Sequence, residues 1–387
     1  MTDRYGSFLY PPEFVERLPR PAAHETRPLL LLLRGEHSNG DAEIERIERW
    51  FRELDGPDDR KAALAGNLRS PKPRQFWSAL SELMTSRVFV ELGCRPRFEV
   101  AVAGVTPDFA VRSQAGVEFP AEVLTAFEEK EYAEADADLH YVASALAGIQ
   151  HRVAVFIDDV DLPATRPSMK PMLGLVQAWL ETCRPGEAST LSLTAEEIGF
   201  ALTVSTAGVR ERPSAIVTGI VGQGGKIETH ETIRAAIGKK VNRYRYVKEV
   251  GLPLVVFVWQ GTWMHVSNTP VEWALFGQDQ VTFTRARGGG LTDAQWGRAP
   301  GGLFGFGRDG ASGPENTRVS AVVYGEREPR SGSVYARLRV YQHPFAATPL
   351  PRDLFAGIPQ LVPVKATAGE VVVEWNGEPG GALLLLR

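Results

Sequence analysis

The sequence predicts an α/β protein with a core of the order α-β-β-β-α-β, a helical N-terminal extension and a β-rich C-terminal part. Helical periodicity runs over residues 76–92 and ends at Gly93, a favoured residue just beyond a helix. Three short extended segments joined by tight turns fill residues 97–124. After an acid-rich helical stretch, the apolar run 153–157 is typical of a buried parallel strand.

The segments before this core are irregular or amphipathic. Residues 1–28 are rich in proline and predict an irregular arm, and the apolar run 29–33 predicts a buried strand or a short core segment. Residues 41–54 carry apolar side chains at helical spacing, which predicts an amphipathic surface helix. The turn-forming residues 56–59 are expected to end it.

The segments after the core alternate between helices and strands. Helices are expected at 171–182 and 231–250, and strands at 199–205, 215–220, 254–259, 318–324 and 335–341. Glycines gather from about residue 285, and Asn376-Gly377 predicts a last hairpin. The expected domains are a helical extension (1–75), a core domain (76–284) and a Gly/Pro-rich, β-rich C-terminal region (285–387).

Composition is that of an ordinary globular protein. The 387 residues are 43% hydrophobic and 23% charged, with a formal net charge of −4, which argues against indiscriminate coating of nucleic acid. Cys94 and Cys183 belong to no metal or disulfide pattern, which fits a reducing compartment. No apolar stretch approaches the length of a membrane helix, so a cytoplasmic location is expected.

Three carboxylates have chemically specific spacing. Glu82 lies on the predicted helix 76–92, Asp108 directly precedes the second short strand, and Glu122 lies in the third. Two adjacent strands can hold such carboxylates against one Mg²⁺ ion, for which Mn²⁺ can substitute, and the carbonyl of Val123 would be a third ligand. A site of this kind suits phosphodiester hydrolysis, in which a metal activates water and neutralises charge on the phosphoryl oxygens.

Simpler explanations exist for two of these residues. A glutamate on an amphipathic helix, such as Glu82, is usually solvated, and Asp108 after a proline is also a good turn residue. Glu122 is harder to dismiss, because a carboxylate among apolar neighbours in a central strand is costly without a partner.

The order of elements with Glu82, Pro107-Asp108 and Glu122-Val123-Leu124 resembles the PD-(D/E)xK, or restriction-endonuclease-like, nuclease superfamily over residues 76–158. The resemblance implies metal-dependent cleavage of nucleic acid, DNA more than RNA, and allows a homodimer. It also implies a catalytic lysine two residues after Glu122, where this chain has Leu124. Lys240 is the first candidate for a lysine supplied by another element, and Lys130 is the second.

The helix expected at 231–250 is basic and carries interleaved aromatic residues. Such a pattern can follow a phosphate backbone and stack bases, and an ordinary solvated helix face is the alternative. The candidate nucleic-acid-binding residues are Arg234, Lys239, Lys240, Arg243, Tyr244 and Lys248.

A rival interpretation keeps the fold and removes the chemistry. Leu124 favours a catalytically inactive nuclease-like module that binds nucleic acid or serves assembly. Such a module would bind in a salt-dependent way with no metal requirement.

Overall fold

The computed structural model describes most of the chain. The described residues are 8–18, 28–33, 40–102, 104–127, 138, 141–143, 145–146, 149–163, 165–184, 187–215, 218–220, 230–244, 251–261, 269–285, 291–298, 302–305, 313–330, 333–367, 370–378 and 381–387.

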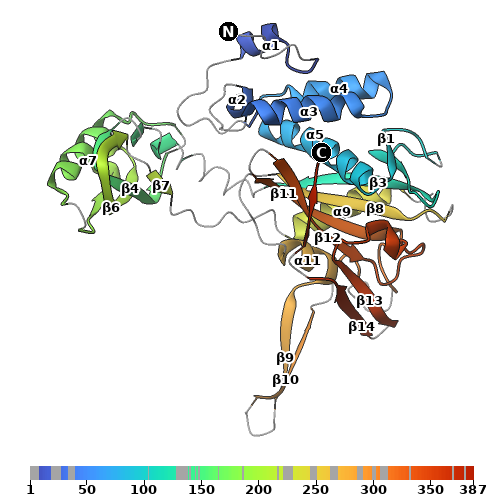
Figure 1. Cartoon of the computed structure of the whole chain (residues 1–387). Coiled ribbons are helices and arrows are strands. Elements are labelled where there is room, and N and C mark those ends of the chain that lie inside the picture. The colour runs from blue at the N-terminus through green and yellow to red at the C-terminus, as the bar shows by residue number, and fades with distance from the viewer. Residues whose placement is uncertain are drawn as a thin grey trace. The chain divides into compact units, whose positions relative to one another are not determined.

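The chain forms two compact units (Figure 1). The first contains Met1–Arg17, Gly35–Phe127 and Ile227–Arg387, and the second contains Leu18–Arg34 and Glu128–Lys226. The second unit is thus mostly an insertion between the strand that carries Glu122 and the helix that carries Lys240. The domain boundaries expected at 75/76 and 284/285 stay predictions.

In the described part of the chain, four helices precede the sheet of the first unit. They are α1 (Pro12–Arg17), α3 (Gly40–Glu53), α4 (Asp58–Leu68) and α5 (Pro73–Glu91). The amphipathic helix expected at 41–54 and the helix expected at 76–92 are confirmed as α3 and α5. Helix α1 lies in the arm expected to be irregular. Helix α4 was missed because residues 56–59 end one helix and also begin the next, with acidic residues in its first turn.

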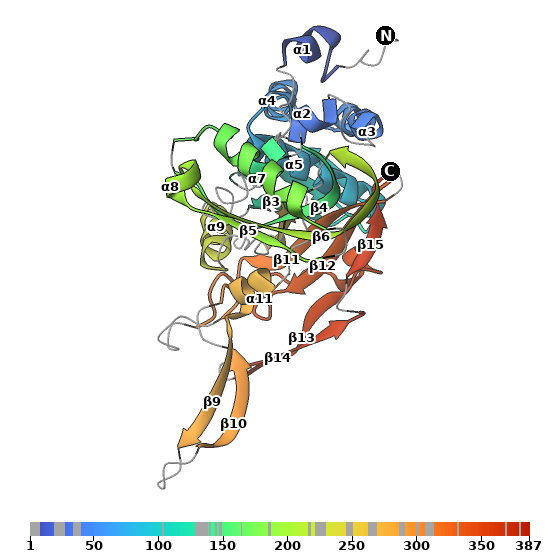
Figure 2. The ribbon, with the colours of Figure 1, turned by 90° about the vertical axis from the view of Figure 1, so that its left-hand side faces the viewer.

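A nine-stranded mixed sheet forms the centre of the first unit (Figure 2). Its strands are β1 (Arg95–Phe98), β2 (Phe109–Arg112), β3 (Glu118–Ala126), β8 (Leu254–Gln260), β11 (Val319–Arg330), β12 (Ser333–Gln342), β13 (Gln360–Thr367), β14 (Glu370–Asn376) and β15 (Ala382–Leu385). The path runs β1-β2-β3-β8-β11-β12-β13-β14, and β15 also pairs with β12. The meander expected at 97–124 is therefore confirmed, and the protein is a mixed α/β fold.

The strand after the meander is not the predicted one. The apolar run 153–157 lies in β4 (Gln150–Asp161), which belongs to a separate sheet in the second unit. Instead β8 pairs in parallel with β3, and the helix that precedes β8 among the described residues is α9 (His230–Asn242). Both runs are equally apolar, so only strand pairing could distinguish them.

The C-terminal strands complete the same sheet. Strand β11 pairs in parallel with β8 and antiparallel with β12. The hairpin expected at Asn376-Gly377 is wrong, because β14 pairs with β13 and β15 pairs with β12. The remaining elements of this region are α11 (Thr269–Phe276), the 3-10 helix η1 (Arg352–Phe355), and the two-stranded ribbon of β9 (Asp279–Arg285) and β10 (Leu291–Arg298).

The second unit has its own sheet and core. Its sheet has the order β5-β6-β4-β7, formed with β5 (Thr190–Leu193), β6 (Ala201–Ala215) and β7 (Thr218–Ile220). Helix α7 (Lys170–Thr182) supplies Met172, Val176 and Leu180 to the buried core. This unit also contains α2 (Pro28–Leu33) and α8 (Ala195–Ile198). The run 29–33 is thus a short buried helix, which agrees with the expected core segment and excludes the strand, and α7 confirms the helix expected at 171–182.

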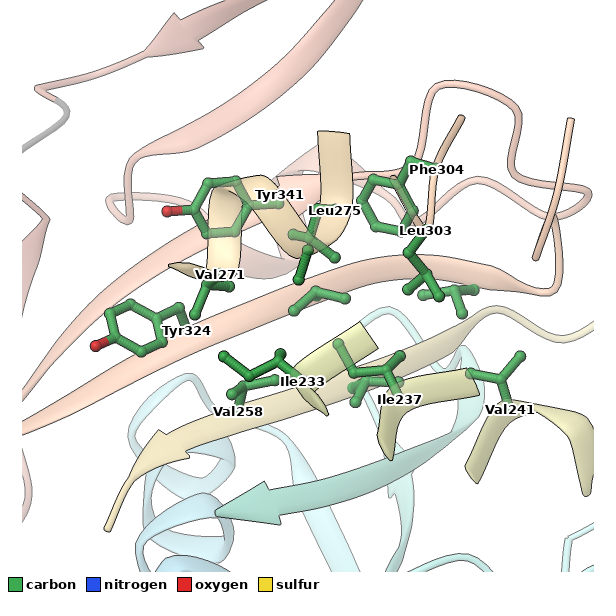
Figure 3. Packing of buried hydrophobic residues seen from close by; sticks show 14 of the residues in the cluster. Ile233, Ile237, Val241, Val258, Val271, Leu275, Leu303, Phe304, Tyr324 and Tyr341 are labelled. Carbon is green, nitrogen blue, oxygen red and sulfur yellow. The ribbon is translucent and has the colours of Figure 1, made fainter. Parts of the chain in front are cut away.

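Helix α9 is fixed to the large sheet by a continuous apolar face (Figure 3). Ile233, Ile237 and Val241 recur at helical spacing and pack with side chains of β8, α11 and β11. All three side chains are buried. This packing determines which residues of α9 face the sheet and which face solvent.

Among the described residues, no helix is long and apolar enough to cross a membrane.

Candidate active site

Asp108 directly precedes β2, at the end of the β2–β3 pairing, and β3 extends past this point. Phe109 pairs with Ala121, so the β2 partner ends there, and the next residues of β3 face the loop that holds Asp108. Asp108 Oδ2 accepts a hydrogen bond from the backbone N–H of Val123 at 2.6 Å. The backbone carbonyl of Asp108 accepts one from the N–H of Glu99 at 2.9 Å. The carboxylate is thus fixed against the open edge of β3.

Glu122 lies in β3, between β2 and β8, with its side chain only 1% exposed. Side chains alternate along a strand, so Glu122 and Leu124 share one face of the sheet. That face is covered by α9, because Leu124 packs with the cluster that contains Ile237. Glu122 therefore carries a carboxylate into a largely apolar layer, as its sequence neighbours suggested.

Lys240 of α9 reaches both carboxylates. Its Nζ atom lies 2.5 Å from Asp108 Oδ2 and 2.6 Å from Glu122 Oε2, and its side chain is 18% exposed. Glu122 Oε2 is buried and makes no well-aligned hydrogen bond, so its partner is the ammonium charge at short range. Helix α9 thus supplies a lysine on the face where Leu124 provides none.

Burial and neighbouring charges shift the pKa values of Glu122 and Lys240. Burial raises the pKa of the Glu122 carboxyl to about 8, with a contribution from Asp108, while Lys240 opposes this rise. Burial by itself lowers the pKa of Lys240, but Asp108 and Glu122 outweigh it and hold the ammonium pKa above its usual value. Lys240 is accordingly a permanent cation in this site at neutral pH.

Glu82 approaches from α5, on the other face of the sheet. The hydroxyl of Thr125 donates to Ser81 Oγ at 2.9 Å, and the indole N–H of Trp259 donates to Thr85 Oγ1 at 2.7 Å. These bonds join α5 to β3 and β8 and fix the rotation of the helix that carries Glu82. Burial raises the pKa of Glu82 to about 8, and nearby Asp108 adds to the rise.

Glu99 is a fourth carboxylate near the site that the sequence did not single out. It has a positive φ of 45°, unusual for a non-glycine residue, and pairs with Arg60 at 3.2 Å. Burial raises its pKa, and Asp108 contributes in the same direction. Its backbone conformation is set by the loop joining β1 to β2, which no local sequence pattern reveals.

The expected metal ligands can be compared with this geometry. The N–H and C=O of one strand residue point to the same edge, so the Val123 carbonyl faces the side on which Asp108 binds the Val123 N–H. Asp108 and Glu122 meet at Lys240 Nζ, and the Val123 carbonyl lies on the Asp108 side of β3. Within the described residues, no group of three or more His, Cys, Asp or Glu side chains has the arrangement of a metal site.

The expected nucleic-acid-binding residues divide into several groups. Lys239 and Arg243 are exposed, and Arg234 is half-buried. Tyr244 must be corrected: its side chain is 2% exposed and belongs to the core, so it offers no surface for base stacking. Lys248 and Lys130, as well as the end of the helix expected at 231–250, lie outside the described residues.

Comparison of the chain with protein-family models, with curated proteins and with solved structures finds no match.

Proposed function

We propose that the protein is a metal-dependent nuclease with a restriction-endonuclease-like core that hydrolyses phosphodiester bonds, with DNA favoured over RNA. The observation that carries the proposal is the contact of Lys240 with both Asp108 and Glu122. Two acids from adjacent strands and a lysine from a distant helix would form the two acids and the lysine of a PD-(D/E)xK site. Lys240 would have the catalytic role of the lysine that this superfamily carries at the position of Leu124.

The donor set fits a hard divalent cation such as Mg²⁺. Asp108 and Glu122 supply carboxylate oxygens, Val123 supplies a carbonyl, and the buried Glu122 Oε2 lacks a well-aligned hydrogen bond. When bound, such a cation activates water and neutralises charge on the phosphodiester. Mn²⁺ would substitute for Mg²⁺ because it also accepts oxygen ligands.

The protein's own residues would divide the remaining work. The Lys240 ammonium can donate hydrogen bonds to a phosphoryl oxygen and stabilise the charge that builds on it. The Glu82 carboxyl has a pKa of about 8, so above that pH it is ionised and could hold a metal-bound water. Lys239 on the same helix as Lys240, and Arg243 just beyond the end of that helix, are exposed and would contact the phosphate backbone.

Cleavage assays with Mg²⁺ on duplex DNA, single-stranded DNA and RNA test the proposal. Asp108→Asn, Glu122→Gln and Lys240→Gln preserve side-chain size, and each should reduce cleavage by a factor of about 10² or more. Circular dichroism controls for folding, and Glu118→Gln, an exposed position on β3, should cleave normally. Undiminished cleavage by Glu122→Gln would reject the assignment.

An inactive nucleic-acid-binding or assembly module is the second candidate, and Leu124 favours it. Leu124 packs against the apolar cluster beside α9 and contributes no charge to the site. This candidate predicts salt-dependent DNA binding, weakened by Lys239→Gln and Arg243→Gln, with no cleavage of any substrate and no effect of chelators.

A further inference from the structure

The Lys240 ammonium lies at the point on which the two carboxylates converge. Asp108 Oδ2 and Glu122 Oε2 both contact its Nζ atom, at 2.5 and 2.6 Å. A Mg²⁺ ion shared by the same two oxygens would lie about 2.1 Å from each. The metal ion and the ammonium group therefore cannot both lie at this point.

We propose that Lys240 is the resident cation of the metal-free site, and that a divalent cation binds Asp108 and Glu122 by displacing its ammonium group. This inference rests on the proposed metal site. It assigns the lysine a role before the reaction begins, in addition to its role during cleavage.

The charge balance of the site supplies the driving force. When both carboxylates are ionised, one ammonium leaves a net negative charge beside a buried strand, which is unfavourable in a medium of low polarity. A divalent cation can neutralise both carboxylates where a single ammonium cannot. Replacing the ammonium group by the metal ion therefore stabilises the two carboxylates. The metal must displace the lysine to bind, so the lysine lowers the affinity of the site for metal.

Lys240 also has a path out of the site. It lies two residues before the end of α9, on a flexible four-carbon stem, and its side chain remains partly exposed. Its neighbour Val241 is buried, so the helix itself can stay in place while the side chain rotates. A displaced ammonium group would remain close to the site, where it could contact a phosphoryl oxygen. Metal binding would thus prepare the lysine for catalysis.

Mn²⁺ binding to the full chain without nucleic acid tests the inference, with free Mn²⁺ measured by electron paramagnetic resonance at pH 8.5. Lys240→Gln removes the competing charge and should bind Mn²⁺ about tenfold more tightly, a difference of about 1.4 kcal/mol. Lys240→Arg keeps the charge and should gain nothing. Lys170→Gln, the same charge change at an exposed position outside the site, should bind Mn²⁺ like the wild type.

The outcomes separate the two proposals. Equal or weaker Mn²⁺ binding by Lys240→Gln overturns the displacement model while leaving the metal site intact. Absence of Mn²⁺ binding by the wild type and by Lys240→Gln overturns the proposed function and this inference together.

A second measurement keeps the inference testable if Lys240→Gln fails to fold. Acylation of Lys240 in the wild type, followed by mass spectrometry, should be slow without metal and faster with saturating Mn²⁺, because the ammonium group leaves its carboxylate partners. The acylation of Lys239 should not change. Identical Lys240 acylation with and without Mn²⁺ would overturn displacement.

Discussion

At the scale of single residues, the site depends on carboxylates that are held in a poorly hydrated place. Burial is the main reason that the pKa values of Glu82 and Glu122 are both about 8. Such groups are protonated in the folded protein at pH values where the unfolded chain has already ionised them. Their contribution to stability is therefore present at low pH and is lost as the pH rises from about 4.5 to about 8.

The variant Glu82→Gln tests this effect. In metal-free protein the glutamine cannot ionise, so the fall in stability between pH 5.5 and pH 9 should shrink by about 1–3 kcal/mol, after allowance for water near the partly open site. Thermal unfolding across this pH range measures it. Glu196→Gln, an exposed position, is the control. An unchanged pH slope in Glu82→Gln would show that its carboxyl is ordinarily hydrated.

Position 124 offers a second test at this scale. Leu124 and Glu122 point to the same face of β3, two residues apart, and α9 brings Lys240 to that face. The double variant Leu124→Lys with Lys240→Leu moves the lysine back to the strand. Under the proposed function, it should partly restore the Mg²⁺-dependent cleavage that Lys240→Leu alone loses. Cleavage no better than in the single variant would mean that the strand position does not reach the scissile group.

At the scale of elements, α9 connects the core to the site. Its apolar face packs against β8, β11 and α11, and the residue just before the buried Val241 is the site lysine. The geometry of the site therefore depends on packing that involves no charged group.

Ile237→Ala should loosen this element. Ile237 is fully buried, so its truncation should lower the free energy of unfolding by about 2–4 kcal/mol. It should also reduce cleavage if Lys240 is catalytic, because the lysine loses its fixed position. Urea denaturation measures the first effect, and Asn242→Ala, exposed on the same helix, should be near neutral. A change in stability below 0.5 kcal/mol, on the order of a typical surface substitution, would contradict the packing.

At the scale of the whole molecule, the first unit is joined by contacts between distant parts of the chain. Glu43 of α3 pairs with Arg46 and with Arg327 of β11, at 2.5 Å in each case. The indole of Trp50 donates to the backbone carbonyl of Arg387 at 2.7 Å. The N-terminal helices and the C-terminal strands are therefore parts of one unit.

The second unit has a separate core, which predicts separate unfolding. Leu180 is fully buried in that core, so Leu180→Ala should destabilise the second unit by about 2–4 kcal/mol. Differential scanning calorimetry should show one transition moving to lower temperature while the transition of the first unit stays in place. Leu175→Ala, an exposed position on the same helix, is the control. A single transition that moves as a whole would show that the two cores unfold together.

The sequence by itself determined the local elements and the acidic residues. Periodicity identified α3, α5 and the meander, because side-chain alternation is a local property. Tyr244 could also have been recognised as a core residue, since it continues the spacing of Ile233, Ile237 and Val241. The basic residues on either side of Tyr244 favoured a surface position for its side chain, and that prediction was wrong.

Only the tertiary structure decided which distant segments meet. Two similar apolar runs were candidates for the strand beside β3. In the structure β8 pairs with β3, and β4 belongs to another sheet. Because α9 packs against β8, this pairing places Lys240 of α9 beside β3, where position 124 is a leucine. The sequence named Lys240 as a candidate, but its 2.5 and 2.6 Å contacts exist only because strand pairing and helix packing act across an insertion of about a hundred residues. Such long-range pairing depends on the complementarity of whole surfaces, which no local pattern records.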